Sequence, residues 1–203
     1  MKKQIGWRDN MKTIGFVRHG ITEWNKERRW QGATDIPLAE EGVREAHLAA
    51  SRLAEEDWEI IYASPLKRAR ETAEIIREAI PGIDLRFDER LKEVYGGNLE
   101  GTTEEERVKK WGTDWRIRAE EYGMESDSDM TARGMAFLEE VRKLPEERIL
   151  IVSHGGFISR MLKAMTPERE YTERLLNTSL TVVELRDDRN LCTLYNCTKH
   201  LNA

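Results

Sequence analysis

The chain has 203 residues, of which 39% are hydrophobic and 35% are charged, and its formal net charge at pH 7 is −5. This length fits one well-buried domain better than two, and so large an apolar fraction excludes general disorder. The charge shows none of the basic excess that nucleic-acid binding requires, and no apolar run approaches the roughly 20 residues needed to cross a bilayer. We therefore expect a cytoplasmic protein, a monomer or a homodimer, with neither nucleic acid nor membrane as a partner.

The first ten residues resemble no helix or strand. Met11-Lys12-Thr13 would serve equally well as a start, directly before the first predicted strand. The polar N-terminus also lacks the apolar stretch of a signal peptide. We expect residues 1–10 to be a disordered or dispensable extension and residues 11–203 to form a single domain.

Short apolar runs predict strands, and runs with helical periodicity predict helices that alternate with them. The predicted strands are 13–17, 59–63, 148–153, 181–185 and 191–195. The predicted helices cover 40–55, 66–80, 131–144 and a segment that follows Gly156. In the first helix, one apolar face carries Val43, Ala46, Ala50 and Leu53. The alternation predicts an α/β fold whose mainly parallel central sheet is flanked by helices on both faces.

Two stretches depart from this alternation. Residues 96–129 carry acidic and aromatic side chains without clean periodicity, and we expect them to form a small cap insertion over the crevice at the strand ends. The turn-rich link 186–190 predicts a C-terminal hairpin at the sheet edge. Cys192 and Cys197 are five residues apart on one predicted strand, where they cannot pair with each other. With only His200 nearby, they lack the ligands of a metal site.

Two of the four histidines directly follow predicted strands and directly precede glycine, in His19-Gly20 and His154-Gly155-Gly156. In a parallel sheet, ligands bind in the crevice beyond the carboxyl ends of the strands. Glycine at such a point lets the main chain turn sharply and lets a ligand approach it closely. Packing explains this placement poorly, although a single His-Gly pair is weak evidence of function.

Arginines stand at the same strand ends. Arg18 adjoins His19, and Arg68 follows the second predicted strand in the run from Ser64 to Ala73. Arginine binds phosphate through two parallel hydrogen bonds and keeps its charge at physiological pH. Two guanidinium groups with two imidazoles would bind a dianionic phosphoryl group, so no metal and no cofactor is expected.

The run Arg18-His19-Gly20-Ile21-Thr22-Glu23-Trp24-Asn25 resembles the signature of the histidine phosphatase superfamily, in the phosphoglycerate mutase-like branch that includes broad-specificity and α-ribazole phosphatases. Five later segments match in the family's order, so that the similarity covers nearly the whole chain from Thr13 onward: Gln31-Gly32 with Asp35-Ile36-Pro37-Leu38, Ser64 to Ala73, Leu91-Lys92-Glu93 with Gly101, Gly123-Met124-Glu125-Ser126, and Val152 to Gly156. The acid phosphatase branch carries Asp directly after the second His, where this chain has Gly155.

The resemblance implies that His19 is the nucleophile and Glu93 the general acid and base. It also implies that the phosphoryl oxygens are held by Arg18, Arg68 and His154. A neutral imidazole is a good nucleophile near pH 7, and the phosphoramidate it forms is labile enough for a second, hydrolytic step. By the same resemblance we expect the phosphate pocket to include Gly20, Thr22, Asn25, Gln31, Gly32, Tyr95, Gly155 and Gly156.

Three functions share this set of residues. The expected one is metal-independent hydrolysis of a small-molecule phosphate ester through a phosphohistidine. A cofactor-dependent phosphoglycerate mutase is the nearest alternative, but mutases that resemble this chain have a longer segment between the acid and the second His, here 61 residues from Glu93 to His154. Arg116 and Arg118 are candidates for a second anionic group. A non-catalytic phosphate-binding scaffold typically loses the nucleophile or an arginine, and this chain keeps both.

Overall fold

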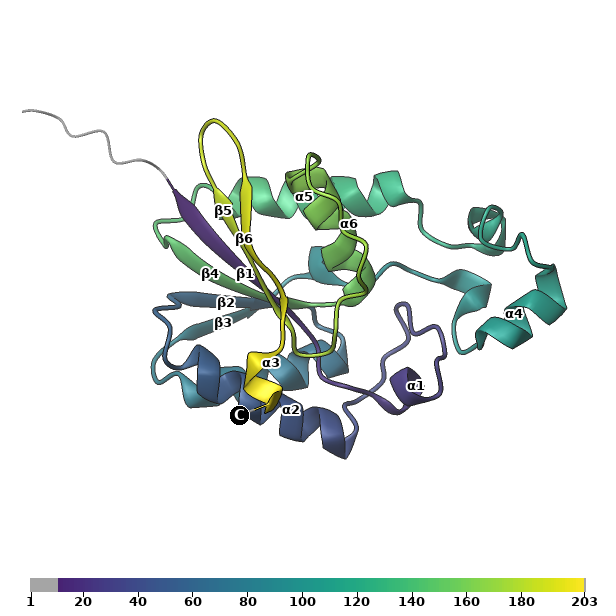
Figure 1. The fold of residues 1–203 in the computed structure, drawn as a ribbon, viewed down its shortest axis with the longest axis horizontal. Coiled ribbons are helices and arrows are strands. Elements are labelled where there is room, and N and C mark those ends of the chain that lie inside the picture. Colours follow the sequence, from purple (N-terminus) through teal and green to yellow (C-terminus); the bar gives the residue numbers. More distant parts are fainter. Residues whose placement is uncertain (1–10, 203) are drawn as a thin grey trace, which may run out of the picture.

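The fold is described from a computed structural model, in which residues 11–202 are placed. The extension predicted for residues 1–10 lies outside the described residues. A six-stranded sheet runs through the centre in the order β3-β2-β4-β1-β5-β6 (Figure 1). Its strands are β1 (Lys12–Arg18), β2 (Ile60–Ala63), β3 (Asp84–Phe87), β4 (Arg148–Ser153), β5 (Leu180–Leu185) and β6 (Leu191–Cys197).

The first four strands pair in parallel, whereas β5 runs antiparallel to both β1 and β6. This confirms the mainly parallel sheet and the C-terminal edge hairpin. Both cysteines lie on β6 as free thiols. The short edge strand β3 was not predicted, because its sequence Asp-Leu-Arg-Phe is largely exposed and carries no apolar run.

Helices cover both faces of the sheet, as predicted (Figure 1). On one face lie α2 (Glu40–Leu53) and α3 (Lys67–Ala79), and on the other lie α5 (Asp127–Val141) and α6 (Gly155–Met165). Successive residues of β4 point to opposite faces: Ile149 and Ile151 pack with α5 and α6, and Leu150 and Val152 with α2 and α3. Within residues 11–202, none of the helices combines the length and apolar character that a bilayer span needs.

The predicted apolar face of α2 is wrong at one position. Val43 is 37% exposed, whereas Gly42 is buried. Gly42 faces inward because its backbone contacts the backbone of Ile21. A Cβ at Gly42 would lie 2.1 Å from the Ile21 carbonyl oxygen. The site-bearing segment after β1 is thereby packed directly onto this helix.

The cap insertion contains α4 (Glu104–Trp111), which projects from the main body in Figure 1. Leu99, Trp115 and Ala119 form a small apolar cluster of their own, against which Trp30 packs. The remaining short elements are helix α1 (Glu23–Lys26) and the 3-10 helices Glu89–Leu91, Gly97–Leu99, Ala119–Tyr122 and Lys199–Asn202.

Candidate active site

Two parallel strands bring the two histidines together. Arg18, the last residue of β1, pairs in register with Ser153, the last residue of β4. His19 and His154 follow directly, and the His19 amide donates to the Ser153 carbonyl at 2.9 Å. The imidazole centroids are 5.2 Å apart. The predicted convergence at the carboxyl ends of the strands is therefore present.

Two buried arginines flank the histidines. Arg68 donates to the carbonyls of Thr34 and Gly32 at 2.8 and 2.7 Å, and Arg18 donates to that of Leu175 at 2.6 Å. Burial lowers the pKa of each guanidinium to about 10, which leaves both protonated at neutral pH. Since carbonyls rather than carboxylates hold them, both keep their charge available for an anion.

Three buried nitrogen atoms here have no hydrogen-bond partner within residues 11–202. They are Nε of Arg18, Nε of Arg68 and Nδ1 of His154. A buried donor without an acceptor costs free energy that a bound ligand can recover. In the described part of the chain, no group of three or more His, Cys, Asp or Glu side chains is arranged to hold a metal ion.

The ionisation state of His19 follows from its surroundings. Burial, together with the charges of Arg68 and Arg18, lowers its pKa well below 6.5, so the imidazole is neutral at pH 7. Its Nδ1 lies 2.7 Å from the Gly20 carbonyl oxygen. Because a carbonyl only accepts, Nδ1 carries the hydrogen and Nε2 keeps a free lone pair. Nε2 is therefore the ring atom with a lone pair available to a bound ligand.

The second imidazole is neutral for the same reasons. Burial and then the charge of Arg68 lower the pKa of His154 well below 6.5, and its Nε2 lies 2.7 Å from the Ser64 hydroxyl. The cationic charge of the site thus comes from the arginines alone. His154 offers a neutral hydrogen-bonding group.

These two buried histidines predict a pH-dependent stability. Below pH 6.5 the unfolded chain binds a proton at each histidine that the folded chain does not, so the free energy of unfolding should fall as the pH falls, by up to about 1.4 kcal/mol per pH unit for each. Urea unfolding at pH 7.0, 6.0 and 5.5 measures this. In the variant His154→Gln the slope of the unfolding free energy against pH should shrink by the contribution of one histidine, up to about 1.4 kcal/mol per pH unit. An unchanged slope would contradict a neutral His154 in the folded state.

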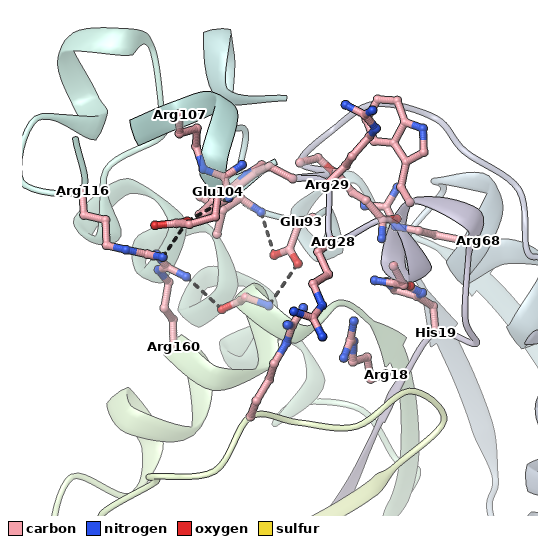
Figure 2. A pocket seen from close by; sticks show the side chains of 18 residues that line it. Arg18, His19, Arg28, Arg29, Arg68, Glu93, Glu104, Arg107, Arg116 and Arg160 are labelled. Atoms are coloured by element: carbon pink, nitrogen blue, oxygen red, sulfur yellow. Dashed lines mark hydrogen bonds and ion pairs between the residues drawn. The ribbon is translucent and has the colours of Figure 1, made fainter. Parts of the chain in front are cut away.

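Glu93 lies against the first turn of α6. Its Oε1 accepts hydrogen bonds from the amides of Val94 and Phe157 at 2.9 and 2.8 Å, and its Oε2 accepts one from the amide of Gly156 at 3.0 Å. A Cβ at Gly156 would lie 2.5 Å from Oε1, which explains the glycine there. In Figure 2, Glu93 and His19 face the same cavity.

Arg133 on α5 fixes the segment that carries Glu93. It donates to the carbonyls of Lys92 and Glu93 at 2.9 and 3.3 Å, and it forms an ion pair with Glu125 at 2.7 Å. The Glu125 amide in turn donates to the Tyr95 carbonyl at 2.8 Å. This positioning role was not predicted from the sequence, although Glu125 belongs to one of the matched segments. Nothing in the sequence pattern links Arg133 to a site 40 residues earlier.

A cavity of about 540 Å³ opens beside His19 (Figure 2). The predicted residues that line it are Arg18, His19, Asn25, Gln31, Gly32, Arg68, Glu93 and Gly156. The cap contributes Glu104, Arg107 and Arg116, so the insertion borders the cavity as predicted. Trp24 and Trp30 add apolar surface to its wall.

The other predicted pocket residues, and His154 with them, are not among the residues that line the cavity. Thr22 is buried and caps α1 with its side chain. Gly20 is a glycine for a packing reason, because a Cβ there would lie 2.5 Å from the Gly42 carbonyl oxygen. A Cβ at Gly155 would lie 3.2 Å from Nε of Arg18, and the Tyr95 side chain is 53% exposed.

The sheet, the paired histidines and their arginines define a phosphatase that works through histidine. The chain belongs to the histidine phosphatase superfamily, branch 1, whose family model matches residues 14–198. It is an enzyme that hydrolyses phosphate esters. This agrees with the resemblance drawn from the sequence.

Relatives carry both phosphatase and mutase names. The chain is 36% identical over 197 residues to the uncharacterized phosphatase PhoE of Bacillus subtilis, covering 95% of this chain and 98% of that protein. It is 36% identical over 187 residues to the probable phosphoglycerate mutase GpmB of Escherichia coli, covering 87% and 86% of the two chains.

Solved structures of phosphatases have the same fold. A mycobacterial glucosyl-3-phosphoglycerate phosphatase in complex with VO3 superposes with a TM-score of 0.82 at 26% identity, covering 92% of this chain and 99% of that one. A phosphoserine phosphatase mutant from Entamoeba histolytica superposes with a TM-score of 0.76 at 30% identity, covering 94% of this chain and 99% of that one.

Proposed function

We propose that this chain is a metal-independent phosphomonoester hydrolase that forms a phosphohistidine on His19. The observation that carries the proposal is the neutral His19, oriented by the Gly20 carbonyl and set beside two buried, charged arginines. A nucleophile with a free lone pair and a fixed cationic pocket for the phosphoryl oxygens is what a covalent displacement at phosphorus needs.

In the first step Nε2 of His19 forms a bond to phosphorus while the bond from phosphorus to the ester oxygen breaks. Charge spreads over the three equatorial oxygens, where Arg18 and Arg68 stabilise it. The Nδ1 hydrogen stays hydrogen-bonded to the Gly20 carbonyl oxygen and keeps the ring oriented as it gains positive charge. Two cations fixed in a buried site replace the metal ion that other phosphatases use.

Glu93 moves the protons. It gives one to the leaving oxygen in the first step and takes one from the attacking water in the second. All three hydrogen bonds to its carboxylate come from amide groups, an arrangement that fits the ionised base of the second step. In the first step one carboxyl oxygen carries the proton that is delivered to the leaving oxygen, and that oxygen gives up its hydrogen bond from an amide.

Phosphate release with a chelator present tests this function. We expect the purified protein to release inorganic phosphate from p-nitrophenyl phosphate and from alkyl phosphates, at rates that EDTA leaves unchanged within about twofold. Loss of activity in EDTA with recovery on adding a divalent metal would overturn the metal-independent mechanism. Failure to release phosphate from any ester would instead favour a scaffold.

Relatives with mutase names keep the alternative of phosphoryl transfer in view. Incubation with 3-phosphoglycerate separates the two reactions. A hydrolase yields glycerate and inorganic phosphate, whereas a mutase yields 2-phosphoglycerate without loss of organic phosphate. We expect hydrolysis, because the cap between Glu93 and His154 is short.

A further inference from the structure

The cavity beside His19 carries more cationic charge than one phosphoryl group uses. Two glutamates line it, Glu93 and Glu104, against eight arginines: Arg18, Arg28, Arg29, Arg68, Arg107, Arg116, Arg160 and Arg174. Arg18 and Arg68 serve the phosphoryl group. Six further arginines therefore need an explanation.

Four of the six form ion pairs with carboxylates. The ion pairs are Arg29 with Glu27, Arg107 with Glu104, Arg116 with Glu104, and Arg160 with Asp127, at 2.6, 3.0, 2.9 and 2.5 Å. Arg118, the other sequence candidate for a second anion, does not line the cavity and donates to the Trp111 carbonyl. Within residues 11–202, Arg28 and Arg174 are the two cavity arginines outside the phosphoryl site that form no ion pair.

The loop that carries Arg174 is fixed to the sheet and to the site. The Asn196 side chain donates to the Arg174 carbonyl at 3.1 Å, and the next residue, Leu175, accepts from Arg18 at 2.6 Å. The two guanidinium groups are close enough for the charge of Arg174 to help burial lower the pKa of Arg18 to about 10. Arg174 thus stands beside the phosphoryl site on an anchored backbone.

Arg28 lines the same cavity from the segment that follows α1. It follows α1 with a φ of 58°, in the left-handed region that residues other than glycine seldom adopt. Its amide donates to the Asn25 carbonyl at 3.2 Å, which fixes the turn. In Figure 2 its side chain extends into the cavity between Glu93 and Arg18.

We propose that Arg28 and Arg174 form a second anion subsite, and that the substrate is a phosphomonoester whose alcohol carries a further anionic group, a carboxylate or a second phosphate. Like charges that line one cavity without counter-ions repel, and an anion bound between them reduces that repulsion and gains charge-assisted hydrogen bonds. A cavity of about 540 Å³ also has room for more than one phosphoryl group. The substrate assignment rests on the proposed hydrolase, whereas the subsite is testable by binding alone.

Matched ligand pairs test the subsite. 3-Phosphoglycerate and glycerol 3-phosphate differ by a carboxylate in place of a hydroxymethyl group. Propane-1,3-diol bisphosphate and its monophosphate differ by one phosphate. Titration calorimetry on the non-hydrolysing variant His19→Ala should show a preference of about tenfold or more for the more anionic member of at least one pair. Whichever pair shows it identifies the group as carboxylate or phosphate.

Adding Arg28→Gln or Arg174→Gln should reduce that preference by about tenfold. The matched control is Arg116→Gln, which removes the same charge from the same cavity but leaves Glu104 paired with Arg107. The control should change the preference by less than about threefold, the share expected of a screened charge alone. Circular dichroism melting curves check that each variant is folded.

The subsite is refuted if neither pair shows a preference, if the preference survives both substitutions, or if Arg116→Gln reduces it equally. Phosphate release by the parent protein is measured separately on glycerol 3-phosphate. If the protein shows the predicted binding preference but hydrolyses nothing, the proposed hydrolase is refuted and the subsite is supported. Hydrolysis without the preference would do the reverse.

Discussion

Replacing His19 with alanine is expected to lower kcat by a factor on the order of 10⁴ to 10⁶. The variant keeps Arg18, Arg68 and the cavity, so it still binds phosphate esters. It loses the proposed nucleophilic atom, Nε2 of His19, whose lone pair the Gly20 carbonyl leaves free. A water molecule that replaces the imidazole is not held in a fixed position. It also cannot form the covalent intermediate that divides the reaction into two easier steps.

The covalent intermediate gives this prediction a second readout. Brief mixing of the parent protein with a ³²P-labelled ester, followed by denaturation, should yield a phosphoprotein that is labile in acid and stable in alkali. His19→Ala should carry no such label. His47→Ala is the matched control, because His47 is exposed on α2 and away from the cavity, and it should label like the parent. A label that persists in His19→Ala would refute the assignment of the nucleophile.

The convergence of the two histidines could be predicted from the sequence, because both occupy positions that local patterns reveal. His19 and His154 follow apolar strands directly, and parallel pairing then brings them together without further information. Arg68 and Glu93 needed the family resemblance, since an arginine or a glutamate in a chain with 35% charged residues is usually solvated. The strands that carry the site were predicted to within two residues at either end.

What could not be predicted depends on contacts between distant segments. The inward turn of Gly42 depends on the backbone of Ile21, and the role of Arg133 depends on how α5 crosses the Glu93 segment. Arg28 lies in the run Lys-Glu-Arg-Arg, which reads as solvated surface. Only the placement of carboxylates around the cavity separates it from the paired Arg29, and no periodicity encodes that placement.

Replacing Glu93 with glutamine should reveal its role through the leaving group. For an alkyl phosphate, whose alkoxide is a poor leaving group, we expect kcat/KM to fall about 10²- to 10⁴-fold, the usual contribution of general acid catalysis. For p-nitrophenyl phosphate the phenolate leaves without a proton, and the fall should be about tenfold or less. The parameter kcat/KM covers the steps up to cleavage of the ester, so hydrolysis of the common phosphoenzyme does not enter it.

The comparison between the two substrates also separates chemistry from structural damage. Glutamine keeps one oxygen, so its NH₂ group would face at least one of the amides that now donate to the carboxylate, with an expected loss of stability of about 1 to 3 kcal/mol. A displaced or partly unfolded site lowers kcat/KM for both esters by the same factor, whereas loss of the acid lowers it mainly for the alkyl ester. Equal losses on both substrates would therefore assign Glu93 a structural role at the start of α6. Another group would then have to protonate the leaving oxygen.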